Sequence, residues 1–163
     1  MSSFLQQLGP LAGATRFRRI SEKLYADGDI IYKNAGVNFK ATWFPVYYLL
    51  SITEARLTVT QIAHEIGFTH ITVKNVLREL QQEGLVTIVA NPDDGRSKLA
   101  SLSCKGKNRL RQLEPIWVQF SQALKSILDE GHPEIITILD NIDTALETKP
   151  ISQRIQEIAN PKP

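Results

Sequence analysis

Cysteine and histidine are scarce in this sequence. Among its 163 residues there is one cysteine, Cys104, and there are three histidines. A single thiol excludes an internal disulfide framework, and so few thiol and imidazole groups leave little for a zinc site. We therefore expect no metal and no cofactor. Cys104 has two interpretations, a redox sensor beside Lys105 or a passive small residue.

Long apolar runs are also missing. No uninterrupted run approaches the roughly 18 to 20 residues that a membrane-spanning helix needs. The opening segment "MSSFLQQLGPLAGATRFRR" has its basic residues after its apolar ones, which is the wrong order for a secretory signal. With 42% hydrophobic and 22% charged residues, the chain can bury a substantial core. We expect a cytoplasmic globular protein with no membrane partner.

Neither sign of charge is in large excess, since the net charge is +2. The distribution is uneven, because residues 55–111 carry nine Lys and Arg against five Asp and Glu, whereas residues 112–163 carry four against eight. Residues 1–54 carry six against four. A basic middle and an acidic end indicate that the middle meets a polyanion. Ordinary solvated faces produce charge differences of similar size, so this pattern alone does not establish that the middle of the chain binds a polyanion.

The first third of the chain is typical of helices. "ATRFRRISEKLYADGDIIYKNAG" places Phe17, Ile20 and Leu24 at helical spacing, and Gly36 is a suitable end. "FKATWFPVYYLLSIT" is dense in apolar and aromatic residues, with Pro45 in its first turn. We expect this second segment to be buried.

The middle third predicts two short helices joined by a turn. In "LTVTQIAHEIGF", Thr60 is a candidate cap and Gly67 a candidate end. In "THITVKNVLRELQQEGL", four apolar residues recur at i, i+3, i+4 and i+7, and Gly84 closes the pattern. The four are Val73, Val76, Leu77 and Leu80. Two helices joined by about three residues that include glycine are typical of a helix-turn-helix.

A predicted β-hairpin and a long helix follow. "LVTIVA" and "KLASLS" are short strand-like runs that flank "NPDDGRS". From Ser103 a long helical pattern begins, in which Gly106 is tolerated and Pro115 should bend or divide the helix. An amphipathic tail helix and a short segment after Pro150 complete the chain. This order predicts a mainly α fold with a small β-hairpin, a winged helix-turn-helix.

The predicted domain spans residues 1–163. It consists of N-terminal helices over 1–54, the winged helix-turn-helix over 55–111 and C-terminal helices over 112–163. The flanking helices are more apolar than so small a module needs. We therefore expect them to pack against a second subunit.

The second helix of a helix-turn-helix lies in the DNA major groove, where the side chains opposite its apolar stripe meet the bases. On this hypothesis those side chains are Thr69, His70, Thr72, Lys74, Asn75 and Arg78. Asn bonds adenine bidentately, and Lys bonds guanine or phosphate.

On the hairpin, Arg96 and Lys98 form a basic tip suited to the minor groove or the backbone. Any surface helix is polar outside, so a winged helix that binds protein without DNA is the alternative.

The hairpin tip also carries acidic residues, which do not suit a polyanion. Asp93 and Asp94 are typical of turn formation, and we expect one of them to orient Arg96 through a charge-assisted hydrogen bond. The chain has no phosphate-loop spacing, acid–base pair or nucleophile constellation. We therefore expect no enzyme.

Taken in order, these segments resemble the DNA-binding core of MarR-type transcription regulators. The resemblance covers 57–117 and includes Glu-Gly-Leu-Val after the second helix, the Asp-Gly-Arg-Ser wing and the Ser- and Gly-containing opening of the next helix. "LGPLAGATRFRRISEKL" and "FKATWFPVYYLL" resemble the regulator half of proteins that fuse this module to an acetyltransferase domain. We expect no acetyltransferase domain here.

The resemblance implies a homodimer with interleaved N- and C-terminal helices, which binds double-stranded DNA at a pseudo-palindromic operator. The residues that match the base-facing helix are Thr69, His70, Thr72, Lys74 and Asn75, and Arg96 matches the wing arginine. Many relatives have Arg at the position of Asn75 and a small hydroxyl residue at that of Lys74. The operator sequence therefore does not carry over.

The resemblance further implies release of the DNA when a small aromatic effector fills a crevice beside the winged module. Candidates for lining it are Tyr25, Phe39, Trp43, Tyr47 and Tyr48. Aromatic residues at helical spacing are otherwise core residues, so the sequence leaves both interpretations open.

Overall fold

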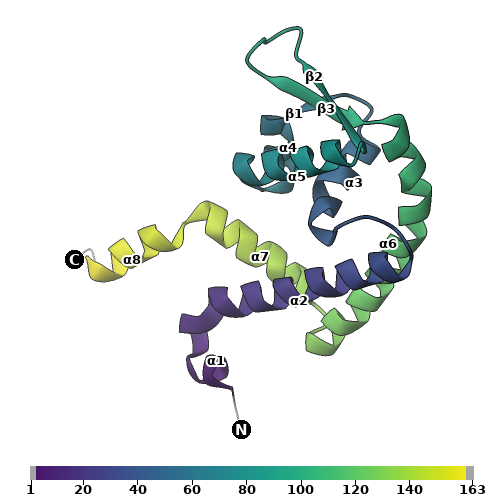
Figure 1. The fold of residues 1–163 in the computed structure, drawn as a ribbon. Coiled ribbons are helices and arrows are strands. Elements are labelled where there is room, and N and C mark those ends of the chain that lie inside the picture. The colour runs from purple at the N-terminus through teal and green to yellow at the C-terminus, as the bar shows by residue number, and fades with distance from the viewer. Residues whose placement is uncertain (1–2, 161–163) are drawn as a thin grey trace. The chain divides into compact units, whose positions relative to one another are not determined.

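The structure is a computed structural model that describes residues 3–160, and it is mainly helical with a small antiparallel sheet (Figure 1). Residues 1–2 and 161–163, at the ends of the predicted domain, lie outside the described residues. The chain divides into two compact units, residues 1–117 and 118–163. Each unit is described by itself.

The first unit contains most of the elements. In chain order they are α1 (Phe4–Gln7), the 3-10 helix η1 (Gly9–Ala12), α2 (Gly13–Asn34), the 3-10 helix η2 (Ala41–Trp43), α3 (Phe44–Ile52), β1 (Leu57–Thr58), α4 (Val59–Ile66), α5 (His70–Gln82), β2 (Val86–Ala90), β3 (Lys98–Leu102) and the first part of α6 (Cys104–Gly131). The predicted first helix is α2, and Gly36 follows it with a φ of 68°. Pro45 lies in the first turn of α3, as predicted.

The cap of α4 differs from the predicted one. Thr58, and not Thr60, precedes the helix: its Oγ1 accepts a hydrogen bond from the backbone N of Gln61 at 3.2 Å, and Gln61 Oε1 accepts one from the backbone N of Thr58 at 2.8 Å. A glutamine three residues after the cap completes this reciprocal pair, which Thr60 could not form. The helix ends at Gly67, whose φ of 67° is left-handed, as predicted.

The second helix of the pair is α5, and it has the predicted apolar stripe. Thr69 Oγ1 accepts a hydrogen bond from the backbone N of Thr72 at 3.1 Å and so caps the helix. The buried residues of α5 are Val73, Val76, Leu77 and Leu80. Residues 67–69 join α4 to α5, which confirms the helix-turn-helix.

The predicted hairpin is confirmed, and a third strand joins it. Strands β2 and β3 pair antiparallel from Val86 opposite Leu102 to Ala90 opposite Lys98, so residues 91–97 form the loop of the wing. On the other edge of β3, β1 pairs antiparallel, giving the order β1-β3-β2. A strand of only two residues has no alternation of its own, which is why the sequence does not reveal it.

The start of α6 lies against the end of the helix-turn-helix. A Cβ added at Gly106 would lie 2.1 Å from the carbonyl oxygen of Leu85, so glycine is required there rather than tolerated. The hydroxyl of Tyr47 donates to the carbonyl oxygen of Gly106 at 2.5 Å. The helix continues through Pro115 without being divided, contrary to one of the two predicted outcomes.

The second unit consists of residues 118–131 of α6, α7 (Ile135–Thr148) and α8 (Ile151–Ala159). These are the predicted tail helix and the short segment after Pro150. Neither α7 nor α8 has a buried residue among those described. Apolar side chains therefore remain exposed along both helices, among them Ile136, Leu146, Ile151 and Ile158.

Replacing Gly106 with Ala should destabilise the winged helix by about 3 kcal/mol, because a backbone carbonyl cannot move aside for the new methyl group. Urea denaturation at a fixed protein concentration measures this change. The matched control is Gly13→Ala, since Gly13 begins a helix and has no atom within 4 Å of an added Cβ. We expect the control to be neutral or slightly stabilising. Equal stability of the two variants would contradict the close approach.

Candidate nucleic-acid interface

All of the side chains predicted to face DNA from α5 are exposed. They are Thr69, His70, Thr72, Lys74, Asn75 and Arg78, and of these Lys74, Asn75 and Arg78 lie on the side of the helix away from its buried stripe. Two of them already have a structural use, because the hydroxyls of Thr69 and Thr72 hydrogen-bond each other at 2.9 Å. Within residues 3–160, by contrast, the side chains of Lys74, Asn75 and Arg78 have no hydrogen bond or ion pair.

One further residue of this outer face is not among those predicted from the sequence. Ile71 is 73% exposed, although it is a large apolar residue. It precedes Lys74, Asn75 and Arg78 at the i, i+3, i+4, i+7 spacing, so these four share one stripe of the helix. The signal that could have found it is the same spacing that identified the buried stripe.

The inner side of α5 is tied to the segment that precedes α3. Glu79 Oε2 accepts hydrogen bonds from Lys40 Nζ at 2.7 Å and from the indole Nε1 of Trp43 at 2.8 Å. The two donors hold the pKa of the Glu79 carboxyl below its ordinary value. One turn further on, Glu83 Oε2 accepts from Asn38 Nδ2 at 2.8 Å. The hydrogen bonds of Glu79 and Glu83 therefore fix the position of the helix that carries the outer face.

The wing loop is held by its own hydrogen bonds. Asn91 Oδ1 accepts from the backbone N of Asp93 at 3.1 Å, and Asp94 Oδ1 accepts from the backbone N of Arg96 at 3.0 Å. The prediction that an aspartate orients the Arg96 guanidinium is therefore wrong in its contact, because the carboxylate binds the backbone instead. The accompanying prediction that an aspartate takes part in forming the turn is confirmed. Arg96 and Lys98 are both exposed, as a contact surface requires.

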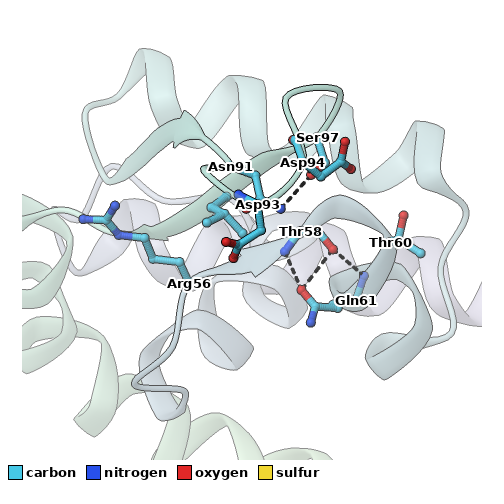
Figure 2. A pocket seen from close by; sticks show the side chains of 9 residues that line it. Arg56, Thr58, Thr60, Gln61, Asn91, Asp93, Asp94 and Ser97 are labelled. Carbon is cyan, nitrogen blue, oxygen red and sulfur yellow. Dashed lines mark hydrogen bonds between the residues drawn. The ribbon is translucent and has the colours of Figure 1, made fainter.

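A polar hollow of about 480 Å³ lies between the wing loop and the start of α4, and Figure 2 shows its lining. The residues around it are Arg56, Thr58, Thr60, Gln61, Asn91, Asp93, Asp94, Ser97 and Leu99. Pockets for aromatic ligands are mostly apolar, and this one is lined almost entirely by polar and charged groups. The hollow therefore does not fit the predicted aromatic effector, and it shares no residue with the predicted effector site.

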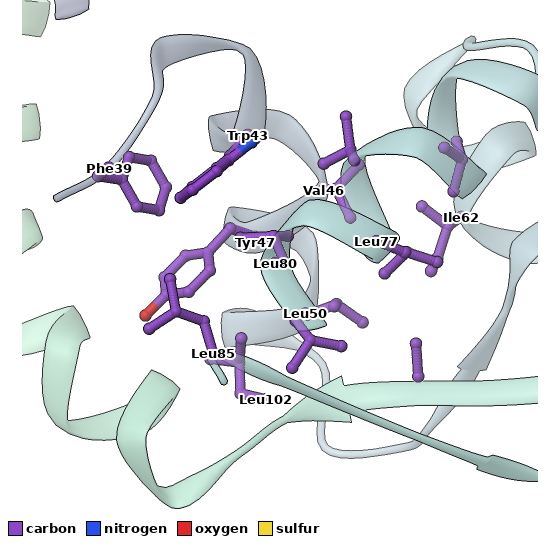
Figure 3. Close-up of a cluster of buried hydrophobic side chains, with 14 of the residues drawn as sticks. Phe39, Trp43, Val46, Tyr47, Leu50, Ile62, Leu77, Leu80, Leu85 and Leu102 are labelled. Carbon is purple, nitrogen blue, oxygen red and sulfur yellow. The ribbon is translucent and has the colours of Figure 1, made fainter. Parts of the chain in front are cut away.

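The residues predicted to line an effector site belong largely to the hydrophobic core (Figure 3). Phe39, Trp43 and Tyr47 are each at most 5% exposed. The ring of Phe39 packs edge-on against Trp43 at 5.5 Å and against Tyr47 at 5.1 Å between centroids. Burial raises the pKa of Tyr47 to about 12, so its hydroxyl stays a hydrogen-bond donor. Tyr25 is partly buried against this core, and Tyr48 is 43% exposed.

Metal-ligand clusters and membrane-spanning helices are both missing from the described part of the chain. Among residues 3–160, no group of three or more His, Cys, Asp or Glu side chains is arranged to hold a metal ion. Over the same range, no helix is both long and apolar enough to cross a membrane. Cys104 is a free, exposed thiol at the first residue of α6.

The comparison with protein families identifies the winged-helix segment. Residues 37–97 match the model of the MarR family. This range includes α3, the helix-turn-helix and the wing loop. No curated protein matches the chain in sequence.

Solved structures of transcriptional regulators share the fold. The Mycobacterium tuberculosis regulator MosR, in complex with DNA, is 23% identical with a TM-score of 0.70, over 83% of this chain and 96% of that one. Staphylococcus aureus MepR, also with DNA, is 24% identical with a TM-score of 0.69, over 82% and 96%. Bordetella bronchiseptica BpsR, whose DNA binding is regulated by 6-hydroxynicotinic acid, is 20% identical with a TM-score of 0.63, over 89% and 96%. At these identities the likeness shows the fold alone.

Replacing Glu79 with Ala should destabilise the protein by about 1 to 2 kcal/mol, because the indole N–H of Trp43 loses its acceptor. The lowered pKa of Glu79 means that the carboxylate stabilises the fold at neutral pH and that this contribution is lost as pH falls below its ordinary pKa of 4.5. Denaturation at about pH 7 and pH 3 should therefore show a smaller difference between the variant and the parent protein at the lower pH.

The matched control for this prediction is Glu65→Ala. Glu65 is an exposed helical glutamate whose carboxylate lies 3.9 Å from the Nδ1 of the exposed His64 side chain. Such exposed pairs contribute little, so we expect almost no change in stability at either pH. An equal loss in both variants would mean that the contact of Glu79 with Trp43 has no specific effect.

Proposed function

We propose that this chain, whose residues 37–97 carry the MarR-family segment, is a homodimeric transcription regulator that binds double-stranded DNA. The observation that carries the proposal is the outer face of α5. There, Lys74, Asn75 and Arg78 point away from the core, and their side chains have no hydrogen bond or ion pair among the described residues. The likeness to MosR and MepR, each solved with DNA, supports the same use of the fold.

In this proposal α5 enters the major groove. Lys74 bonds guanine or phosphate, and Asn75 bonds adenine through its N6 and N7 edge. His70 and Thr72 flank the same face, and the start of α5 brings backbone N–H groups near a phosphate. The hydrogen bonds of Glu79 support the proposal, because a reading helix must be held in one orientation.

The wing makes the second contact. Arg96 and Lys98 are exposed on the hairpin, and Arg96 follows a turn whose backbone is fixed by Asp94. Arginine on a narrow projecting loop enters the minor groove or binds the backbone. The aspartates limit the positive charge of this loop, so Arg96 is its principal attractive group.

Exposed apolar side chains support the proposed dimer. On the N-terminal helices these include Phe4, Leu11, Phe17, Ile20 and Ile30, and on the C-terminal helices Ile136, Leu146, Ile151, Ile155 and Ile158. Apolar patches of this extent on both ends of a chain mark surfaces that a partner covers. The proposed organisation is therefore a winged helix over 55–111 with dimerisation helices over 1–54 and 112–163.

A small aromatic effector is the remaining part of the proposal, and the regulation of BpsR DNA binding by 6-hydroxynicotinic acid supports it. Phe39, Trp43 and Tyr47 are already packed in the core. An effector could therefore reach them only from the partly exposed margin of the core. Tyr25 and Tyr48 lie on that margin. Aromatic edges of this kind suit a planar phenolic or heteroaromatic compound.

Binding of the purified protein to DNA selected from a random pool tests the main proposal. The affinity should fall by roughly 10³-fold or more between about 50 mM and 200 mM salt, because each phosphate contact releases counterions. Gel retardation across a salt series measures the slope. Absent or salt-insensitive binding would favour the alternative, a winged helix that binds another protein.

Arg96→Ala should weaken binding to the selected DNA and reduce the slope of log affinity against log salt by about 0.9, the value for one phosphate. Its melting temperature and dimeric state should not change, since the Arg96 side chain is exposed. Lys125→Ala is the matched control, because it removes one positive charge from an exposed pair with Asp129 outside the winged helix. Equal slopes for the two variants would refute the role of the wing.

A further inference from the structure

Ile71 is the only large apolar side chain that is exposed within residues 55–111, all of which the structure describes. It is 73% exposed, more than most of the exposed apolar residues on the terminal helices. Every other large apolar residue exposed in the described chain lies before residue 55 or after residue 111, on the segments proposed to form the dimer. The dimer interface therefore gives no reason for an isoleucine at this position.

The position of Ile71 also excludes a role in holding α5. The core side of the helix is occupied by Val73, Val76, Leu77 and Leu80. The helix start is capped by Thr69 through the backbone N of Thr72, with no contribution from the side chain of Ile71. An isoleucine that serves neither the core nor the cap leaves apolar area in water, and a partner that covers it gains the free energy of that burial.

The neighbours of Ile71 indicate what that partner is. It shares one helical stripe with Lys74, Asn75 and Arg78, all exposed and without a side-chain hydrogen bond or ion pair among the described residues. Two cations and an amide beside one aliphatic group match the major groove, where phosphates and base edges carry the hydrogen-bonding groups and thymine carries a methyl group. A protein partner would more often meet a wider apolar patch.

We propose that Ile71 recognises the C5-methyl group of a thymine in the major groove. The inference rests on the proposed function and adds the base that this residue reads. Thymine is the one ordinary DNA base with an apolar group in that groove, so an aliphatic side chain there distinguishes it from cytosine and from the purines. Ile71 lies one helical turn before Lys74 and Asn75, and it therefore reads a different base from theirs.

Replacement of thymine by deoxyuridine tests this directly, because it removes only the methyl group and keeps the Watson–Crick pair. In DNA selected by the full-length protein, each thymine is replaced in turn and the affinity is measured. We expect one thymine in each half-site at which deoxyuridine weakens binding by about 4-fold, the size of one buried methyl group. Ile71→Ala should bind the thymine and deoxyuridine forms of that site equally.

Two further variants make the test specific. Asn75→Ala should weaken binding but keep the full preference for thymine over deoxyuridine, because it leaves the methyl contact intact. Ile71→Val should keep most of that preference. The melting temperature of Ile71→Ala should equal that of the parent protein, since the side chain is exposed.

The outcomes separate the two proposals. DNA binding without any thymine at which deoxyuridine matters, or an Ile71→Ala variant that still prefers thymine there, would overturn the role of Ile71 and leave the regulator proposal standing. Selection of no DNA at all would overturn both proposals, and Ile71 would then mark a protein-binding surface.

Discussion

The close approach of Gly106 to the carbonyl oxygen of Leu85 is the constraint on which the rest of the winged helix depends. At this point the end of α5, the start of β2 and the first turn of α6 meet. Ser103 Oγ donates to the carbonyl of Gly84 at 2.6 Å, and Lys105 Nζ donates to that of Glu83 at 2.7 Å. These bonds satisfy the carbonyl groups of the two residues that directly follow α5. The three elements therefore share one fixed junction.

This junction also fixes the root of the wing. Strand β2 begins directly after Leu85, and β3 ends directly before Ser103, whose backbone N donates to the carbonyl of Leu85 at 3.0 Å. The far end of the hairpin, residues 91–97, is held instead by hydrogen bonds within its own loop. A root that is fixed relative to α5 and a tip with its own shape suit a module that must present two contact elements at a set separation. The wing can then position Arg96 without help from the core.

The sequence predicts those parts of the fold whose causes are local. The stripe of α5 and the glycine after α4 follow from spacing and backbone conformation alone, and both are confirmed. The cap at Thr58 was missed because Thr60 has the same side chain, and only the reciprocal bond with Gln61 distinguishes them. β1 and the need for Gly106 depend on segments distant in the chain, β3 and Leu85. No local pattern carries that information.

For the candidate site, the sequence indicates which residue types face outward but not which of them are free. Thr69 and Thr72 have the same exposure as Lys74 and Asn75, yet the two threonines hold the start of α5 and the other two have no such use. The residues that hold the start of α5 are thus different from the residues that are proposed to contact DNA. A change at Lys74, Asn75 or Ile71 costs the fold almost nothing, since none of them packs or caps. If this face binds DNA as proposed, the DNA sequence that it recognises can change while the junction behind it stays the same.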